Sequence, residues 1–536
     1  MIVKKNLNVA YFCMEYGLDK DCKLYSGGLG ILAGDHMKSA HDLNAPLVGI
    51  GIKWKQGYGD QVIDERNAPD CRFYDSNFDF LKETGVKVTV EVEGRVITCK
   101  VWKLDAFGNN PIYLLDTDLP ENGDCSISNR LYAGSSHERV AQEIVLGIGG
   151  VRALRALNIP VNVYHFNEGH AVPAAIELIR EKREKGAGYA DALTATREEC
   201  VFTTHTPVMA GNEEHQLDTL GRMGAFNGLD RSQMEALGGS PFNMTVAALR
   251  LSRKANAVAK LHAETARQMW AWIEDKPDII PITNGVHRAT WTSASVAAAY
   301  RAGNGLWDAH MAEKQTLIDF IKEKNDVALD PDKLLIGFAR RAAAYKRSDL
   351  IFRNQEAADA LFKSGQLQIV FAGKSHPANA TGKLIISRLL EMSRRHPEQV
   401  VFLENYDMEI GAKLTRGADV WLNNPVRPKE ACGTSGMKAA MNGVLNCSVL
   451  DGWWPEACKD GINGWQIGDG KTAADVDNID WHDGQSLHDT LINKIIPAYY
   501  DNRNKWVEMM KASIADTITA FSADRMLEQY YSELYS

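Results

Sequence analysis

The stretch Glu430-Ala431-Cys432-Gly433-Thr434-Ser435-Gly436-Met437-Lys438 links a predicted strand to a predicted helix. The apolar run at 419–422 is typical of a buried strand, and the residues from Lys438 to Met441 favour a helix. The glycines, threonine and serine between them form a turn whose backbone N–H groups lie at a helix N-terminus, which attracts anions. Glu430 stands before this turn, and Lys438 stands about one helical turn beyond it. An ordinary glycine-rich turn beside a solvated lysine fits the local pattern equally well, so the remainder of the chain has to decide.

Strands and helices alternate throughout the second half of the chain. Short apolar strands are expected at 334–338, 368–371, 400–403, 420–422 and 444–450. Helices are expected between them, at 349–364, 382–397, 408–417 and 436–442, and the amphipathic tail at 496–535 is also expected to be helical. This alternation predicts a parallel sheet covered by helices.

The first half of the chain predicts a second α/β unit. A strand at 7–13, the loop Tyr25-Ser26-Gly27-Gly28-Leu29-Gly30, a helix through residue 40 and a strand at 46–52 resemble half of a nucleotide-binding fold. Alternating residues at 86–104 predict an antiparallel hairpin. Helices are expected at 136–157 and 171–185, and further strands at 161–166, 201–204 and 279–283.

These patterns predict an α/β chain built from two Rossmann-like domains that face each other across a cleft. We expect the N-terminal domain at 1–300 and the C-terminal domain at 301–515. A last helix at 516–536 is expected to pack back toward the N-terminal domain.

Composition narrows the classes of function. The 536 residues are 45% hydrophobic and carry a formal net charge of −9, which argues against a general affinity for nucleic acid or anionic membranes. The nine cysteines contain no C-x-x-C pair and no zinc-ligand spacing, so we expect reduced thiols and no metal site. No apolar run is long enough to span a membrane. The chain is therefore expected to be cytoplasmic.

Four cations follow the predicted strand at 334–338. Because arginine suits bidentate phosphate recognition and a helix start disfavours unneutralised cations, we expect a phosphate partner rather than a solvated helix start. The four are Arg340, Arg341, Lys346 and Arg347.

Two histidines and two tryptophans could contact a substrate, but residues of these types at such positions more often have a structural role. His170 and His205 stand after predicted strands, where a lone histidine is more often structural than a general base. Trp453 and Trp454 are more often core residues than platforms for sugar rings. Glu430 has no obvious acidic partner at glycosidase spacing, which argues against hydrolysis.

The combination of motifs resembles the α-glucan (glycogen, starch and maltodextrin) phosphorylases, in particular their shorter bacterial and archaeal members. The motifs that carry the resemblance lie in order along nearly the whole chain: 25–30, His205-Thr206, Thr283-Asn284-Gly285, 340–347, Glu404-Asn405-Tyr406 and 430–438. The resemblance implies the GT-B architecture, with the active site in the cleft between the domains.

The resemblance also implies an activity and its partners. The reaction would be retaining phosphorolysis of α-1,4-glucan or malto-oligosaccharide by inorganic phosphate, which yields α-D-glucose 1-phosphate. The cofactor would be pyridoxal 5′-phosphate, whose phosphate exchanges a proton with the substrate phosphate. No nucleic acid, membrane or metal is expected to take part, and a homodimer is possible.

Residue roles follow from the same resemblance. Lys438 matches the lysine to which the cofactor is attached. The other residues matching cofactor contacts are Arg340, Thr434, Ser435 and Tyr406. The residues matching the catalytic set are Lys438, Arg341, Lys346, Glu430 and His205. The residues matching substrate contacts are Gly27, Gly28, Leu29, Asn284, Cys432 and Gly433.

Two departures from the family pattern and two alternatives accompany this interpretation. Cys432 stands where serine is usual, and Arg340 where lysine is usual. One alternative is a nucleotide-sugar-dependent α-glucan synthase-like glucosyltransferase, a class that lacks the lysine at 438. The other is a carbohydrate-binding protein without activity, against which the intact Glu430, Arg341 and Lys438 argue.

Overall fold

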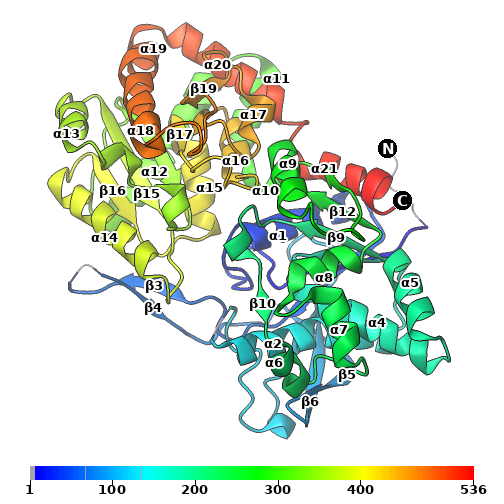
Figure 1. Ribbon diagram of the computed structural model, residues 1–536. Coiled ribbons are helices and arrows are strands. Elements are labelled where there is room, and N and C mark those ends of the chain that lie inside the picture. The colour runs from blue at the N-terminus through cyan, green and yellow to red at the C-terminus, as the bar shows by residue number, and fades with distance from the viewer. Residues whose placement is uncertain (1–5, 67, 133) are drawn as a thin grey trace. The chain divides into compact units, whose positions relative to one another are not determined.

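The computed structural model describes residues 6–66, 68–132 and 134–536 (Figure 1). The chain forms two compact units. Unit 1 contains the described residues up to Gly59, together with Phe73–Thr283 and Ala523–Ser536. Unit 2 contains Asp60–Arg72 and Asn284–Ser522.

Unit 1 is built on a mixed sheet of nine strands. Their order is β13-β12-β9-β8-β1-β2-β7-β6-β5, parallel from β13 to β7 and antiparallel beyond it. The strands are β1 (Val9–Phe12), β2 (Leu47–Ile52), β5 (Lys82–Val92), β6 (Arg95–Leu104), β7 (Ile112–Asp116), β8 (Val163–Asn167), β9 (Cys200–Thr204), β12 (Lys254–Ala257) and β13 (Ile279–Pro281). Numbered along the chain, the parallel strands run 3-2-1-4-5-6-7, so the strand order reverses between β1 and β8. In open α/β sheets, ligands bind beyond the carboxyl ends of the strands at such a reversal.

Helices and a small ribbon complete unit 1. The helices are α1 (Gly28–Asp42), α2 (Ser136–Ile144), α3 (Gly150–Ala156), α4 (Val172–Glu184), α5 (Tyr189–Glu199), α6 (Leu217–Met223), α7 (Arg231–Gly238), α8 (Met244–Arg250), α9 (Lys260–Met269) and α21 (Ala523–Gln529). The ribbon pairs β10 (Glu214–His215) with β11 (Phe242–Asn243).

The sheet of unit 2 has six parallel strands in the order β16-β15-β14-β17-β18-β19. They are β14 (Leu334–Ala339), β15 (Leu367–Ala372), β16 (Val400–Leu403), β17 (Val420–Asn423), β18 (Leu445–Val449) and β19 (Gly464–Ile467). This is the doubly wound order 3-2-1-4-5-6, which reverses between β14 and β17. A separate hairpin, β3 (Asp60–Ile63) with β4 (Pro69–Arg72), also belongs to this unit.

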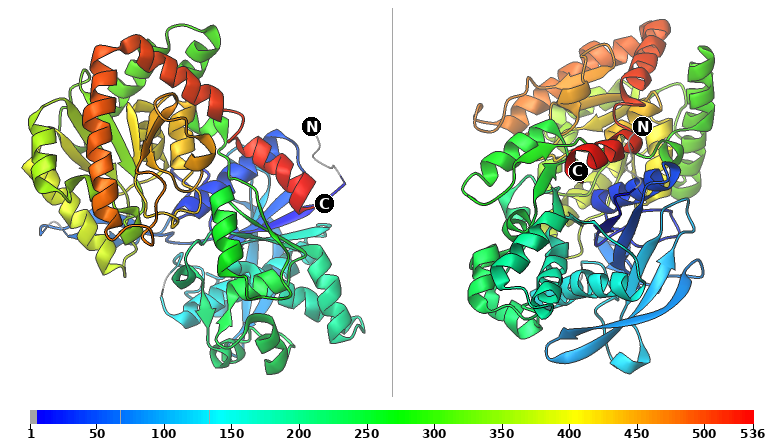
Figure 2. Two further views of the ribbon diagram at one scale, coloured as in Figure 1. Left: turned by 45° about the horizontal axis from the view of Figure 1, so that its top comes forward. Right: turned by 90° about the vertical axis from the view of Figure 1, so that its right-hand side faces the viewer.

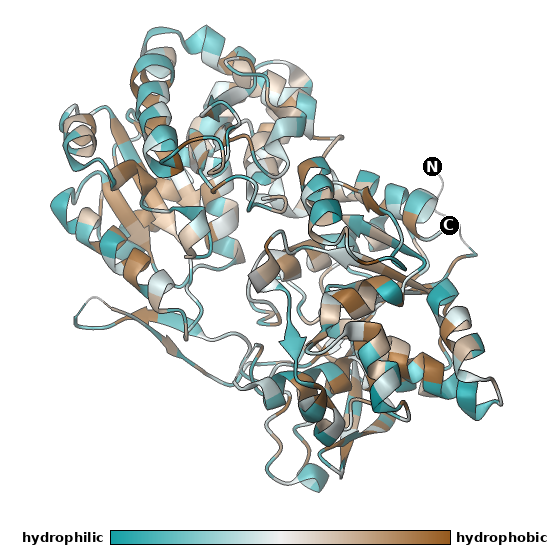
Figure 3. Cartoon of the chain, viewed as in Figure 1, coloured by the Kyte–Doolittle hydropathy of each residue, from teal (hydrophilic) through white to brown (hydrophobic). Residues whose placement is uncertain are grey.

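Helices flank the sheet of unit 2 (Figure 2). They are α10 (Arg288–Trp291), α11 (Ala294–Ala302), α12 (Leu306–Asn325), α13 (Gln355–Lys363), α14 (Ala380–Arg395), α15 (Met408–Gly417), α16 (Ser435–Met441), α17 (Trp454–Ala457), α18 (Ile479–Thr490), α19 (Ile496–Asp501) and α20 (Arg503–Thr517). The central strands are hydrophobic while the outer faces of the helices are hydrophilic (Figure 3). In β14, Ile336 and Phe338 join one core cluster and Leu335 joins another, so the strand is buried on both faces, as parallel strands usually are.

The parallel sheet expected in the second half of the chain is confirmed, as is the hairpin expected at 86–104. The expected helical tail is interrupted: α20 ends at Thr517, and α21 lies in unit 1 beside α1 (Figure 2). There Arg253 donates to the backbone oxygens of Tyr535 and Ser536, at 2.5 and 2.9 Å. Within the described residues, no helix has both the length and the apolar character that crossing a membrane requires.

Candidate active site

The strand reversal in unit 2 brings together residues that lie far apart in the sequence. Arg340 directly follows β14, and Asn423 ends β17. The guanidinium of Arg340 donates to the side-chain oxygen of Asn423 and pairs with the carboxylate of Glu430 at 2.7 Å. The predicted turn therefore meets the predicted cations at the carboxyl ends of the strands.

Glu430 is the centre of this cluster. Its carboxylate also accepts a hydrogen bond from the amine of Lys346, and all three side chains are less than 10% exposed. Burial alone would raise the pKa of Glu430, but Arg340 and Lys346 lower it to about 2. Two cations share one carboxylate, which leaves the cluster one net positive charge and favours an anionic partner.

The other two predicted cations behave differently. Arg347 is 1% exposed and pairs with Asp480 at 3.0 Å and Asp483 at 2.6 Å, while it also donates to the carbonyls of Asn424 and Pro425. Arg347 was expected to bind a phosphate. This expectation is wrong, because two aspartates and two backbone carbonyls of the same unit already accept from its guanidinium N–H groups. Arg341 is exposed, and its role stays a prediction.

Asp451 is a site residue that the sequence did not reveal. It is fully buried, and its two oxygens accept hydrogen bonds from the backbone N–H groups of Glu430, at 2.9 Å, and Gly452, at 2.8 Å. Asp451 is thus an acidic neighbour of Glu430, but both of its oxygens are used by the backbone, so it holds the turn rather than faces a substrate. A Cβ at Gly452 would lie 2.2 Å from the carbonyl oxygen of Cys432, so only glycine fits there.

Asp451 should make stability depend on pH. Burial, and then the charge of Glu430, raise the pKa of Asp451 from 3.8 to about 7. A raised carboxyl pKa stabilises the folded state at low pH, and this contribution is lost as the pH rises through the folded-state value. We expect the free energy of unfolding to fall by about 1 kcal/mol between pH 6 and 8 on account of this group.

Chemical denaturation of the wild type and of Asp451→Asn at pH 6 and pH 8 measures this contribution. In Asp451→Asn, the free energy of unfolding should fall less between pH 6 and pH 8 than it does in the wild type, whatever the variant's absolute stability. Asp477→Asn, which alters an exposed aspartate, should keep the wild-type slope. An equally steep slope in Asp451→Asn would show that Asp451 stays ionised throughout.

Lys438 is buried in α16, with 5% of its surface exposed. Its amine lies 3.4 Å from the centroid of the Trp291 ring. The side chain of Asn442 donates to the backbone oxygens of Lys438, at 2.8 Å, and Trp291, at 3.1 Å, and thereby fixes the two segments together. A buried lysine on an aromatic face is held in one place and is removed from water.

The turn before α16 presents the remaining predicted contacts. Thr434 and Ser435 are half-buried at the start of the helix, and Thr434 makes no side-chain capping bond with it. Gly433 has a φ of +85°, a left-handed conformation that suits glycine, and Cys432 is buried beside it. Asn284 is buried in the same unit.

The aromatic residues of unit 2 separate into two groups. Tyr406 is half-buried, and its pKa is raised to about 12 by loss of solvation and by Asp407, while the nearby charge of Arg340 acts in the opposite direction. Tyr406 therefore stays a neutral hydroxyl near the cation cluster. Trp453 and Trp454 are each 1% exposed and pack against each other, which confirms the expected core role.

In unit 1, the glycine loop runs into α1. A Cβ built on Gly27 or Gly28 meets no atom within 4 Å, and Gly27 has an extended backbone with φ of −160°. Neither packing nor a left-handed conformation accounts for glycine at Gly27, so the loop leaves room beside its backbone. Leu29, the third predicted substrate contact in this loop, is half-buried in the first turn of α1.

His205 follows β9 and contacts the end of β8. Its Nε2 lies 2.6 Å from the side-chain oxygen of Asn167, and its backbone N–H donates to Glu168 at 2.5 Å. Burial, and secondarily His262, lower the pKa of His205 to about 3. The ring is therefore neutral at physiological pH, and because so low a pKa makes it a weak base, it suits hydrogen bonding better than proton abstraction.

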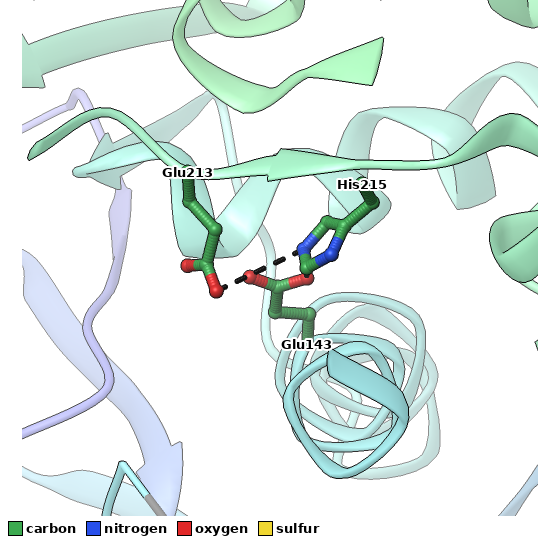
Figure 4. A group of neighbouring side chains, drawn as sticks. All are labelled: Glu143, Glu213 and His215. Carbon is green, nitrogen blue, oxygen red and sulfur yellow. Dashed lines mark hydrogen bonds and ion pairs between the residues drawn. The ribbon is translucent and has the colours of Figure 1, made fainter. Parts of the chain in front are cut away.

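Unit 1 contains a charged cluster of its own, which joins α2 to the segment around β10 (Figure 4). Its side chains are Glu143, Glu213 and His215, whose ligand atoms all lie within 4.8 Å of one another. Arg139 donates to both oxygens of Glu213, at 2.9 and 2.7 Å, and His215 lies 3.0 Å from Glu143. Because these donors already engage the carboxylates, we interpret the cluster as an ion-pair network that fixes α2.

Comparison with known proteins points to one family. Residues 295–480 match the family model described as carbohydrate phosphorylase, a range that contains Arg340, Glu430 and Lys438. The chain is 40% identical to the maltodextrin phosphorylase of Thermococcus litoralis, with 98% of this chain and 70% of the relative covered. It is 36% identical to the glycogen phosphorylase of Mycobacterium tuberculosis, with 98% and 70% covered. An uncharacterised protein of Methanocaldococcus jannaschii is 35% identical, with 98% and 99% covered.

Proposed function

We propose, from the fact that this chain belongs to the carbohydrate phosphorylase family, that it is an α-glucan phosphorylase. The reaction is phosphorolysis of α-1,4-glucan or malto-oligosaccharide by inorganic phosphate, and the product is α-D-glucose 1-phosphate with retained configuration. The observation that carries the proposal is the buried, net positive cluster of Arg340, Lys346 and Glu430, formed at the strand reversal by the same turn that leads to Lys438.

The cofactor we propose is pyridoxal 5′-phosphate, attached to Lys438. The chain's residues fit it: a buried amine lies against an aromatic ring, hydroxyls at Thr434 and Ser435 stand at a helix start, and Arg340 and Tyr406 provide a cation and a neutral hydroxyl. When bound, the cofactor supplies a phosphate that can donate a proton to the substrate phosphate and take it back.

The remaining roles concern the substrates. Arg341 and Lys346 bind inorganic phosphate, and the backbone N–H of Gly28 donates to it. Gly27 and Leu29 are further proposed substrate contacts. Glu430 accepts hydrogen bonds from glucosyl hydroxyls. The other residues proposed to contact the sugar are His205, Asn284, Cys432 and Gly433.

The products of the reaction test the proposal. Incubation of the protein with maltoheptaose and phosphate, followed by NMR, should give α-glucose 1-phosphate as the first product. Free glucose would indicate hydrolysis, and β-glucose 1-phosphate would indicate inversion, so either product would refute the proposal. The nucleotide-sugar synthase is not favoured, because the named relatives are phosphorylases. We further propose a cytoplasmic location and a homodimer.

Arg341→Ala should weaken the use of phosphate far more than that of glucan. A lost charge-assisted contact costs about 1.5–3 kcal/mol, which corresponds to a roughly 10- to 150-fold loss in kcat/KM for phosphate. Separate saturation kinetics for phosphate and for maltoheptaose measure the two effects. Equal losses for both substrates would mean that Arg341 acts structurally.

A further inference from the structure

Glu15 lies at the strand reversal of unit 1, three residues after β1 ends. Its side chain is buried and faces the glycine loop. The Oε2 atom accepts hydrogen bonds from the backbone N–H groups of Ser26, at 2.6 Å, and Gly27, at 3.1 Å. The Oε1 atom accepts a hydrogen bond from the hydroxyl of Tyr132 at 2.6 Å.

These contacts lie directly before α1, a helix without a side-chain cap. Gly27, the N-cap residue, has no side chain, and the first turn of α1 contains no acidic residue. The carboxylate of Glu15 accepts hydrogen bonds from the two amides that directly precede the helix, and not from the amides of its first turn. The amide of Gly28, the first residue of the helix, is therefore not among the donors to Glu15.

The glycine loop also packs closely against Glu15. A Cβ at Gly30 would lie 2.7 Å from Oε2 of Glu15 and 2.6 Å from the Cβ of Tyr25. The N–H of Gly17 donates to the carbonyl of Gly30 at 2.7 Å. The segment after β1 and the glycine loop thus form one closely packed pair, in which a small displacement of Glu15 would move the loop.

Tyr132 in turn packs against an ion pair. The guanidinium of Arg139 lies 4.9 Å from the centroid of its ring, and Glu213 binds that guanidinium through both oxygens. Burial, and then Glu15, raise the pKa of Tyr132 well above its usual value, so the hydroxyl keeps its proton and donates it. The ion-pair network of Figure 4 therefore supports the hydroxyl that fixes Glu15.

We propose that Glu15, fixed by Tyr132, is a positioning residue that holds the Ser26–Gly28 loop so that the Gly28 amide can donate to inorganic phosphate. The inference rests on the proposed phosphorylase function. It predicts that substitution of Glu15 raises the KM for phosphate and leaves the KM for glucan nearly unchanged.

Steady-state kinetics of phosphorolysis, with KM measured separately for phosphate and for maltoheptaose, test this role. Glu15→Ala leaves two amides and two hydroxyls, those of Ser26 and Tyr132, without their acceptor. It should raise the KM for phosphate about tenfold or more, while the KM for maltoheptaose stays within about threefold. Glu15→Gln keeps an acceptor for the amides and can donate to the Tyr132 oxygen, so it should restore the phosphate KM to within about threefold of the wild type.

Two further variants and one physical measurement complete the test. Asp21→Asn removes an exposed carboxylate from the same segment and should change neither KM. Tyr132→Phe, which deletes one hydroxyl, should raise the phosphate KM by about threefold, and it tests the role even if Glu15→Ala does not fold. Hydrogen exchange of peptide 24–30 should be faster in Glu15→Ala than in the wild type, whether or not the protein is active.

The outcomes separate the two levels of the proposal. An active wild type together with normal phosphate KM values in Glu15→Ala and Tyr132→Phe would overturn the positioning role alone. Equal increases in both KM values, without rescue by Glu15→Gln, would assign Glu15 to general stability and overturn it as well. A wild type that forms no glucose 1-phosphate would overturn the proposed function and this inference with it.

Discussion

Lys438→Ala is expected to prevent covalent attachment of the cofactor and to abolish phosphorolysis. The lysine is buried against Trp291, which holds its amine in one place, and attachment to an aldehyde needs an amine at this position. In the proposed reaction, loss of the cofactor phosphate removes a proton donor, so kcat should fall by about 10³-fold or more.

The kcat of the variant is one check of this expectation, and a second check does not depend on activity. Borohydride treatment of the cofactor-loaded wild type should leave the cofactor on the peptide that contains Lys438, as detected by mass spectrometry, and the variant should show no such mass. Lys429→Ala is the matched control, since Lys429 is exposed and directly precedes Glu430. A folded wild type that never takes up pyridoxal phosphate would refute the cofactor assignment.

The sheet of unit 2 could be predicted because its strands are continuous apolar runs. Parallel strands buried on both faces need such runs, and five of the six strands were found in this way. β19 was missed, because Gly464-Trp465-Gln466-Ile467 mixes glycine and a polar residue with its hydrophobic ones. In unit 1, β7 and β12 were both missed. β7 is an apolar run that was overlooked, whereas Lys254-Ala255-Asn256-Ala257 of β12 is small and polar, and only its neighbours bury it.

At the candidate site, the sequence shows which charged residues lie together in one segment but not how they pair. Charge and spacing predicted the cations at 340–347, but a sequence does not show which acid each cation meets. Arg347 meets Asp480 and Asp483, about 130 residues further along the chain, through tertiary structure alone. Asp451 stands before Gly452, a pair common in turns, and its contact with the backbone of Glu430 arises only when β17 and β18 lie side by side.

Glu430→Gln should destabilise the protein more than the other substitutions considered. Arg340 and Lys346 are buried and share this one carboxylate, so its removal leaves two neighbouring cations without an acceptor of opposite charge. Breaking a buried ion pair from one side costs about 3–5 kcal/mol. Because the pKa of Glu430 is lowered from 4.5 to about 2, its stabilising effect in the wild type is present above about pH 4.5 and is lost as the pH falls toward 2.

A double-mutant cycle decides whether charge is the cause. Glu430→Gln/Lys346→Met carries the same net cluster charge as the wild type, so it should regain about 1–3 kcal/mol relative to the sum of the single losses. Denaturant unfolding of the four proteins at pH 7 gives the coupling energy, and at pH 3 the coupling should shrink as Glu430 begins to take up its proton. Additive losses at both pH values would mean that Glu430 stabilises the turn by packing alone. Under the proposed roles of Glu430 and Lys346, phosphorolysis should stay impaired in the double variant even where stability returns. The glucosyl hydroxyls would lose a charged acceptor, and the phosphate would lose the amine of Lys346.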